Sequence, residues 1–374
     1  ARLGLATISP HSANHALALH TEGLIARAQG RQDAARAALC DAVEVLERVD
    51  LGDGVLTDSR FRARHAEVYH ACVAARIDSG DAAGALDVLE QGRARSLLAL
   101  WRGNAAALDG EPQSAVDAWI DYRQRRAAAV AQAADPEKST ADAAQARRDV
   151  DALDARHAEE LARLDAAAPR TASLLVPRSG AAMFGQLPAD ALLPAYSVGA
   201  DETLVLEASV DGVAARRIAI GRAALAADVA DLRGQVLKRS VAALPDLLRV
   251  SAQLHDLLLA PHAAAIARRG RLLVLADGPL LQLPFAALYD QAAARYAVAA
   301  WPIVQVESMG ALALERRDGN ASAGRRALVI ADPLGSDATL PGLPALPGAQ
   351  AEARSVRRAL GAPALLLRGA GASE

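Results

Sequence analysis

The sequence predicts a helical first half followed by an α/β domain with a largely parallel sheet, an α + α/β architecture. Small residues and leucines recur at a fixed offset before residue 100, which is typical of stacked helical pairs. After residue 270, short apolar runs such as LLVLA and ALVIA alternate with loops and helical stretches. Such continuous apolar runs suit strands that are buried on both faces of a parallel sheet.

Composition and charge narrow the class of protein. The chain has 374 residues, enough for two or three domains. Its 41 Lys and Arg nearly balance 44 Asp and Glu, which argues against a broad basic surface for nucleic acid. No apolar run in the sequence approaches the roughly 18 residues of a membrane span. We therefore expect a cytoplasmic protein with no nucleic-acid partner and no membrane segment.

Two helical pairs are expected near the start of the chain. In each pair a glycine ends the first helix in a left-handed turn, an alanine lets the second helix approach closely, and a leucine fills the groove between them. The two copies, 50 residues apart, are marked by Gly30 and Gly80, Ala35 and Ala85, and Leu39 and Leu89. The pattern resembles the tetratricopeptide repeat, whose usual period is about 34 residues, so Val49–Ser59 would be an insertion. Chance agreement between two alanine-rich hairpins is the alternative.

A charged, alanine-rich helical hairpin is predicted over residues 114–168, broken in the middle by Pro136. Before it, Arg93, Arg95 and Arg102 stripe one helix, and we expect this stripe on a solvated face. The run Thr171–Pro188 contains two prolines and several small residues and is typical of a linker.

Strands begin after this linker. Two apolar runs, Thr203–Val210 and Val213–Ile220, flank Asp211-Gly212, a strong signal for a β-hairpin. Helical stretches follow around Ala223–Lys238 and Leu247–Arg268, and Pro261 divides the second.

Four further strands are predicted, and an aspartate directly follows two of them. Asp277 follows one strand and Asp332 another, at the edge of a parallel sheet where open α/β folds bind ligands. Both are candidates for lining a cleft, although an aspartate before Gly or Pro often caps a turn instead. The four predicted strands are Arg271–Ala276, Ile303–Val306, Ala327–Ala331 and Ala364–Leu367.

The segment Gly270–Leu288, GRLLVLADGPLLQLPFAAL, resembles the CHAT domain, a caspase-like cysteine peptidase module often found behind tetratricopeptide repeats. Six other segments, three before and three after this one, also resemble the family and stand in its order along the chain. They are Gly84–Leu98, Leu193–Leu206, Leu254–Pro261, Glu307–Leu312, Ala327–Pro333 and Leu346–Arg354. The resemblance covers roughly residues 60–374 and implies a caspase-like α/β domain.

The resemblance also implies a Cys–His dyad, in which imidazole takes the thiol proton and the thiolate attacks a peptide carbonyl. The family places both residues C-terminal to the segment that ends this chain. Here the histidines stop at His262 and the cysteines at Cys72, so no catalytic residue can be assigned to this chain. Cys40 and Cys72 are too few for a disulfide framework, suit a reducing compartment and are expected to be packing residues. No metal or other cofactor is expected.

Three parts are predicted: tetratricopeptide-like helical repeats over residues 1–110, a charged helical hairpin over 111–170, and the N-terminal portion of a CHAT domain over 171–374, incomplete at its C-terminus. We expect a fragment of a cysteine endopeptidase for a protein substrate, with repeats that bind a protein partner or regulator. This chain alone is expected to be inactive. The alternative is a non-catalytic interaction scaffold with a pseudo-peptidase domain.

Overall fold

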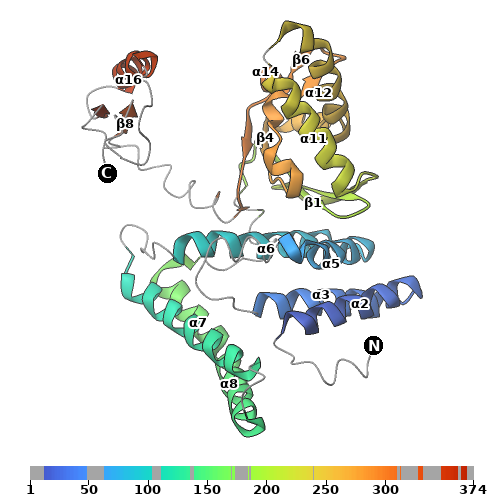
Figure 1. Ribbon diagram of the computed structural model, residues 1–374, viewed down its shortest axis with the longest axis vertical. Coiled ribbons are helices and arrows are strands. Elements are labelled where there is room, and N and C mark those ends of the chain that lie inside the picture. The colour runs from blue at the N-terminus through green and yellow to red at the C-terminus, as the bar shows by residue number, and fades with distance from the viewer. Residues whose placement is uncertain are drawn as a thin grey trace. The chain divides into compact units, whose positions relative to one another are not determined.

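A computed structural model gives the fold in two compact units, Ala1–Leu314 and Glu315–Glu374 (Figure 1). The structure describes residues 12–48, 63–102, 111–134, 139–169, 171–172, 184, 187–238, 240–309, 312, 327–331, 347–360 and 364–368.

Two helical pairs form the start of the first unit, as predicted. Gly30 and Gly80 end the first helix of each pair with positive φ angles of 74° and 80°. Gly23 lies so close to Leu39 that an added Cβ would come within 2.5 Å of the leucine side chain. The pairs are α2 (Ala13–Ala28) with α3 (Gln32–Arg48), and α5 (Ala66–Asp78) with α6 (Ala82–Arg102). Their assignment to the tetratricopeptide family stays a prediction, and Val49–Ser59 lies outside the described residues.

The predicted charged hairpin is also present, as α7 (Gln113–Ala134) and α8 (Thr140–Ala167). Trp119 and Tyr122 of α7 are buried with Leu164 of α8 in a small separate core. Ser139 caps α8 by accepting a hydrogen bond from the backbone N–H of Asp142. The predicted break at Pro136 lies outside the part of the chain that the structure describes.

A five-stranded sheet follows in the order β3-β2-β1-β4-β7. β4 and β7 are parallel, as expected, and β1 is parallel to β4, whereas β1 and β2 pair antiparallel, as do β2 and β3. The sheet is therefore mixed: β2 and β3 form the predicted hairpin, and a tight turn makes the β1–β2 pair antiparallel as well. The strands are β1 (Ala191–Val198), β2 (Thr203–Ser209), β3 (Gly212–Ile218), β4 (Arg271–Val274) and β7 (Ile303–Gln305).

Helices cover both faces of this sheet. On one face, Leu192, Tyr196 and Val198 of β1 pack in a core with α11 (Arg222–Leu237), α12 (Leu244–Leu258) and α13 (Ala263–Arg269). The short helix η2 (Ala260–His262) separates α12 from α13, so the predicted division at Pro261 is confirmed. A short antiparallel pair, β5 (Tyr289–Asp290) and β6 (Arg295–Tyr296), and the helix α14 (Ala297–Ala300) complete this region.

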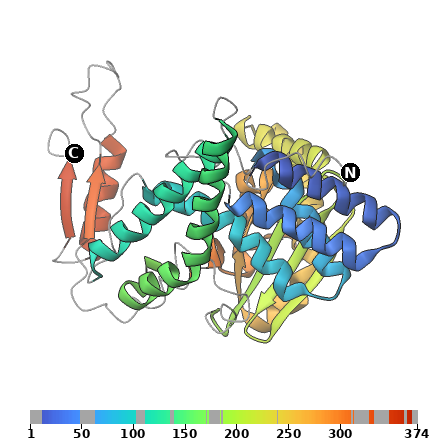
Figure 2. The ribbon, with the colours of Figure 1, turned by 90° about the horizontal axis from the view of Figure 1, so that it is seen from below.

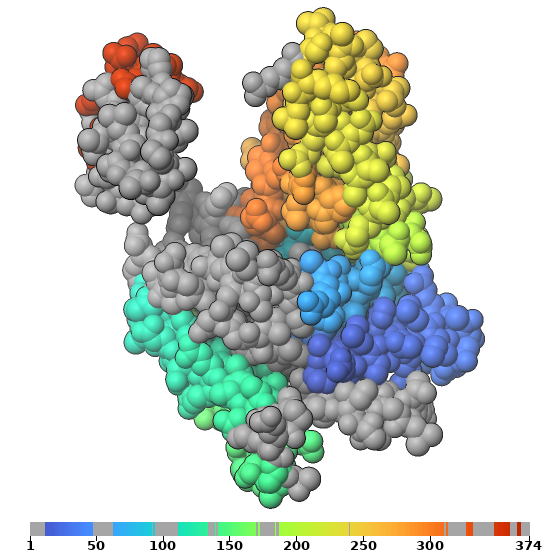
Figure 3. Space-filling view, in the orientation of Figure 1, coloured from blue at the N-terminus to red at the C-terminus, as the bar shows by residue number. Residues whose placement is uncertain are grey.

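The other face of the sheet is covered by the helical pairs. Leu193 and Ala195 of β1 belong to the same buried core as Leu39 of α3 and Leu86 of α6. Figure 2 shows α5 and α6 lying across the strands, and the space-filling view shows α2 and α3 packed against α5 (Figure 3). α5 is therefore buried on every side, with eight consecutive buried residues from Val68 to Ala75.

The second unit contains β8 (Ala327–Ala331), α16 (Pro347–Leu360) and β9 (Ala364–Arg368). The two strands pair in parallel, with Ala327 opposite Ala364, and α16 packs on them. Both strands lie where the apolar runs predict them. This β-α-β arrangement is the one that the parallel pairing requires.

Candidate functional site

The parallel strands β1 and β4 end side by side, and Asp277 ties their carboxyl ends together. Asp277 follows β4, and its Oδ2 accepts a hydrogen bond of 2.9 Å from the backbone N–H of Val198, the last residue of β1. The same carboxylate makes no capping hydrogen bond to its own turn, η3 (Gly278–Gln282). Its role in lining a cleft stays a prediction. Asp332, the second candidate, lies outside the described residues.

A buried histidine from the helical pairs reaches this strand end. Nδ1 of His70, on α5, lies 3.0 Å from Oγ of Ser197 on β1, within hydrogen-bond distance. Both side chains are buried, at 9% and 3% exposed. Gly199 leaves room for the imidazole, since an added Cβ would come within 2.3 Å of its Nε2. The helical layer and the sheet therefore share a polar contact inside an otherwise apolar interface.

The charges around His70 come from both layers. Glu67, one turn before it on α5, pairs with Arg222 at the start of α11 (3.1 Å) and accepts from the backbone N–H of Ala200 (3.3 Å). Arg222 also donates to the carbonyl oxygen of Val198. Burial lowers the pKa of His70, opposed by the negative charges of Glu67, Glu202 and Asp277 and helped by the positive charge of Arg222. We name this group of residues the β1 junction.

A second buried polar contact joins α6 to the segment that follows β7. Both carboxylate oxygens of Glu90 accept from the backbone N–H of Met309, at 3.0 and 3.1 Å, and Glu90 is only 2% exposed. One turn along α6, Arg93 donates to the carbonyl oxygen of Tyr196 at 3.4 Å. The expectation of a solvated arginine stripe is therefore wrong for Arg93, which is 6% exposed. The sheet covers this face of α6.

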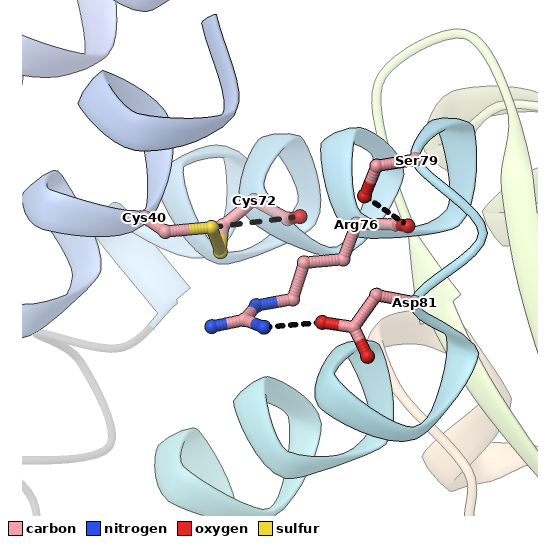
Figure 4. Close-up of a disulfide and its surroundings, with 5 residues drawn as sticks. All are labelled: Cys40, Cys72, Arg76, Ser79 and Asp81. Carbon is pink, nitrogen blue, oxygen red and sulfur yellow. Dashed lines mark hydrogen bonds and ion pairs between the residues drawn. A yellow bond between two sulfur atoms is a disulfide. The ribbon is translucent and has the colours of Figure 1, made fainter. Parts of the chain in front are cut away.

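The prediction that Cys40 and Cys72 are free packing residues is wrong. Their sulfur atoms are bonded, with Cα atoms 4.9 Å apart, in a disulfide between α3 and α5 (Figure 4). The packing of the two helices brings the cysteines within bonding distance, although they are 32 residues apart in the sequence. A sulfur in a disulfide has no thiol proton to lose, so neither cysteine is a nucleophile in this state.

Most of these contacts were missed by sequence reasoning. Glu67, His70 and Glu90 are polar residues in helices, and nothing in their spacing separates them from residues on a solvated face. One signal was available: the apolar pattern of α5 has no polar side, since HACVAA runs through His70 and Cys72. A polar residue inside such a run is expected to be buried and paired.

The described part of the chain lacks two further features. Its histidine, cysteine and acidic side chains form no group of three or more that could hold a metal ion. None of its helices has the length and apolar character needed to cross a membrane.

These observations define an α/β sandwich in which repeat-like helices supply one of the two helical layers. Residues 248–374, from α12 to the end of the chain, match the family model of the CHAT domain. This segment is therefore similar to a CHAT domain, a family that is caspase-like and peptidase-related. β1, β2 and β3 precede the matched segment, yet β1 pairs with β4 inside it. No curated protein matches the chain.

Proposed function

We propose that this chain is part of a CHAT-domain cysteine endopeptidase whose helical pairs bind a protein partner or regulator. The catalytic Cys–His dyad would lie beyond residue 374, and the substrate would be a protein. The match to the CHAT family over residues 248–374 is the observation that carries the proposal. In such a dyad, the imidazole takes the thiol proton and backbone amides stabilise the oxyanion that forms when the thiolate attacks a peptide carbonyl.

The contacts between the layers support a regulatory role for the helical pairs. α5 and α6 share one apolar core with the sheet, and polar contacts from both helices reach the ends of β1 and β7. A partner bound to α2 and α3 would therefore act on helices that pack directly against the strands. α2 offers apolar side chains for such a partner, since Leu17, Leu24 and Ile25 are 41%, 42% and 44% exposed.

The test uses the full native polypeptide with an electrophilic peptide probe that labels active cysteine peptidases. We expect labelling of one cysteine beyond residue 374, lost when that cysteine or the dyad histidine is replaced by alanine. Leu24→Glu should weaken partner binding and partner-dependent labelling without unfolding the protein, while a glutamate at exposed Ala34 serves as the control. Labelling that survives loss of the dyad contradicts the proposal.

The alternative is a non-catalytic scaffold with a pseudo-peptidase domain. Residues 248–374 contain no cysteine, and their two histidines, His255 and His262, are 3% and 0% exposed, which both functions allow. His262 lies 2.8 Å from Glu207 of β2 inside the sheet core, which suits a structural role. A native polypeptide without the dyad, or with a dyad that no probe labels, would support the scaffold.

A further inference from the structure

The disulfide links two different helical pairs. Cys40 lies on α3, the second helix of the first pair, and Cys72 on α5, the first helix of the next. Figure 4 shows the bond crossing between these helices, with the side chain of Arg76 extending from α5 on the same side. The bond therefore joins elements that are otherwise held by side-chain packing and polar contacts.

The two sulfur atoms differ in access. Cys72 is fully buried, at 0% exposed, whereas Cys40 is only partly buried. Thiol–disulfide exchange requires an attacking thiolate to reach one of the two sulfur atoms. Cys40 is the sulfur that a reductant can reach in the folded protein, and Cys72 is then the leaving group.

Two arginines lie one helical turn from the bonded cysteines. Arg36 precedes Cys40 by one helical turn and Arg76 follows Cys72 by one turn, so each shares a helix face with its cysteine. The Nε atoms of both arginines are buried and have no hydrogen-bond partner among the described residues. Other nitrogens of the same groups do have partners: Arg76 pairs with Asp81 at 2.5 Å, and Arg36 lies 3.9 Å from Asp33.

Buried donors without an acceptor are uncommon and call for an explanation. A thiolate is an anion that accepts hydrogen bonds, and neighbouring arginines favour its formation. While the disulfide is intact its sulfur atoms carry no charge, so neither Nε–H group has a thiolate to meet. Reduction would create a thiolate one helical turn from an arginine.

We propose that the Cys40–Cys72 disulfide is a reversible redox site that is opened by a dithiol reductant. A thiolate of the dithiol attacks Sγ of Cys40, the S–S bond breaks, and Cys72 leaves as a thiolate. The second thiolate of the dithiol then attacks the mixed disulfide and releases Cys40. The dithiol is oxidised to a disulfide, and its two protons end on the two cysteines at equilibrium.

In the reduced state the thiol of Cys40 has a nearby hydrogen-bond acceptor. Sγ of Cys40 lies 3.9 Å from the carbonyl oxygen of Cys72, drawn as a dashed line in Figure 4, and a thiol there can donate to that oxygen. After reduction α3 keeps a non-covalent contact with α5, because Tyr69 donates to Glu47 at 2.5 Å. Reduction therefore loosens the first helical pair without exposing an unsatisfied group.

The test measures thiols in the folded protein. Native protein is treated with dithiothreitol at neutral pH, quenched with an alkylating agent and mapped by mass spectrometry, while circular dichroism follows folding. We expect both cysteines to become alkylated with the helical signal retained, and the first mixed disulfide to form at Cys40. Hydrogen exchange should rise in α2 and α3 but stay unchanged in β1 and β4.

Arginine variants test the thiolate environment. Arg36→Gln should slow alkylation of the reduced protein about fivefold, because a partly exposed ion pair stabilises the thiolate by about that factor. Arg36→Lys should restore most of the rate, because it keeps the charge. Arg31→Gln removes an exposed arginine that bonds Gln29 and should change nothing. The proposal is overturned by free thiols in protein purified without reductant, by reduction only on unfolding, or by equal rates in Arg36→Gln and the parent.

Discussion

The Glu90 carboxylate holds the backbone N–H of Met309 with both oxygens, at 3.0 and 3.1 Å, across 219 residues of sequence. Glu90 belongs to the last helix of the helical pairs, and Met309 lies four residues past the end of β7. The chain direction after β7 is thus fixed by a residue from outside the segment that matches the CHAT family. The helical pairs therefore share one core with the sheet and form a layer of the same sandwich.

Replacing Glu90 should destabilise the first unit. Glu90→Ala leaves the buried N–H of Met309 without its charged acceptor, and such losses cost about 2–3 kcal/mol. Glu90→Gln keeps the shape and one acceptor oxygen, so its cost should be about half as large. Urea unfolding measures both changes, and Gln91→Ala on the same helix is the control. Equal stability of Glu90→Ala and the control would show that the contact contributes nothing.

A pair of glycines tests how tightly the layers meet. Gly199→Ala would bring a Cβ within 2.3 Å of the His70 imidazole, so the β1 junction must shift, at a cost of about 1–3 kcal/mol. Gly234 lies inside α11 with no atom within 4 Å of an added Cβ. Gly234→Ala should therefore stabilise the protein by up to about 1 kcal/mol through helix propensity. Thermal melts of the two variants are expected to move in opposite directions.

The local part of this architecture could be predicted from the sequence. Gly30 and Gly80 adopt the left-handed turns that their spacing predicts, and the hairpin forms, although its turn falls at Val210-Asp211, one residue earlier than expected. These features depend on neighbours in sequence, which a pattern records. The apolar runs of β4, β8 and β9 are of the same kind.

The polar contacts between the helical pairs and the sheet could not be predicted in this way. His70 meets Ser197 across 127 residues and Glu90 meets Met309 across 219, and no short pattern records such pairings. The disulfide escaped for the same reason, because it depends on how α3 and α5 are placed in space. Where a helix is buried on every side, as α5 is, the usual contrast between an apolar and a polar face disappears.

Removing the disulfide should lower stability through the unfolded state. The bond closes a loop of 32 residues, and the chain-entropy relation gives about 3–4 kcal/mol for that length. A Cys40→Ala, Cys72→Ala double variant should therefore unfold at a lower urea concentration than the oxidised protein. Reductant should lower the midpoint of the parent protein and leave that of the double variant unchanged. A urea midpoint of the parent protein that stays the same with and without reductant would contradict this explanation.

Acid should weaken the contact between the helical pairs and the sheet. Burial lowers the pKa of His70 below its ordinary value of 6.5, so the unfolded chain binds a proton there more readily than the folded protein does. The stability that neutral His70 contributes is fully present above pH 6.5 and is lost as the pH falls through its lower, folded-state pKa. The unfolding free energy should therefore fall as the pH is lowered from 7.5 to 5, and the slope of this fall is the quantity to compare between variants.

Two variants separate burial from hydrogen bonding in this response. His70→Gln should reduce the slope, leaving the part due to His20, whose pKa burial also lowers. Ser197→Ala removes the hydrogen-bond partner of His70 but keeps the imidazole buried. It should lower stability by about 1 kcal/mol at every pH and retain the slope, because burial is the main cause of the pKa shift. A slope that survives His70→Gln in full would place the acid sensitivity elsewhere in the protein.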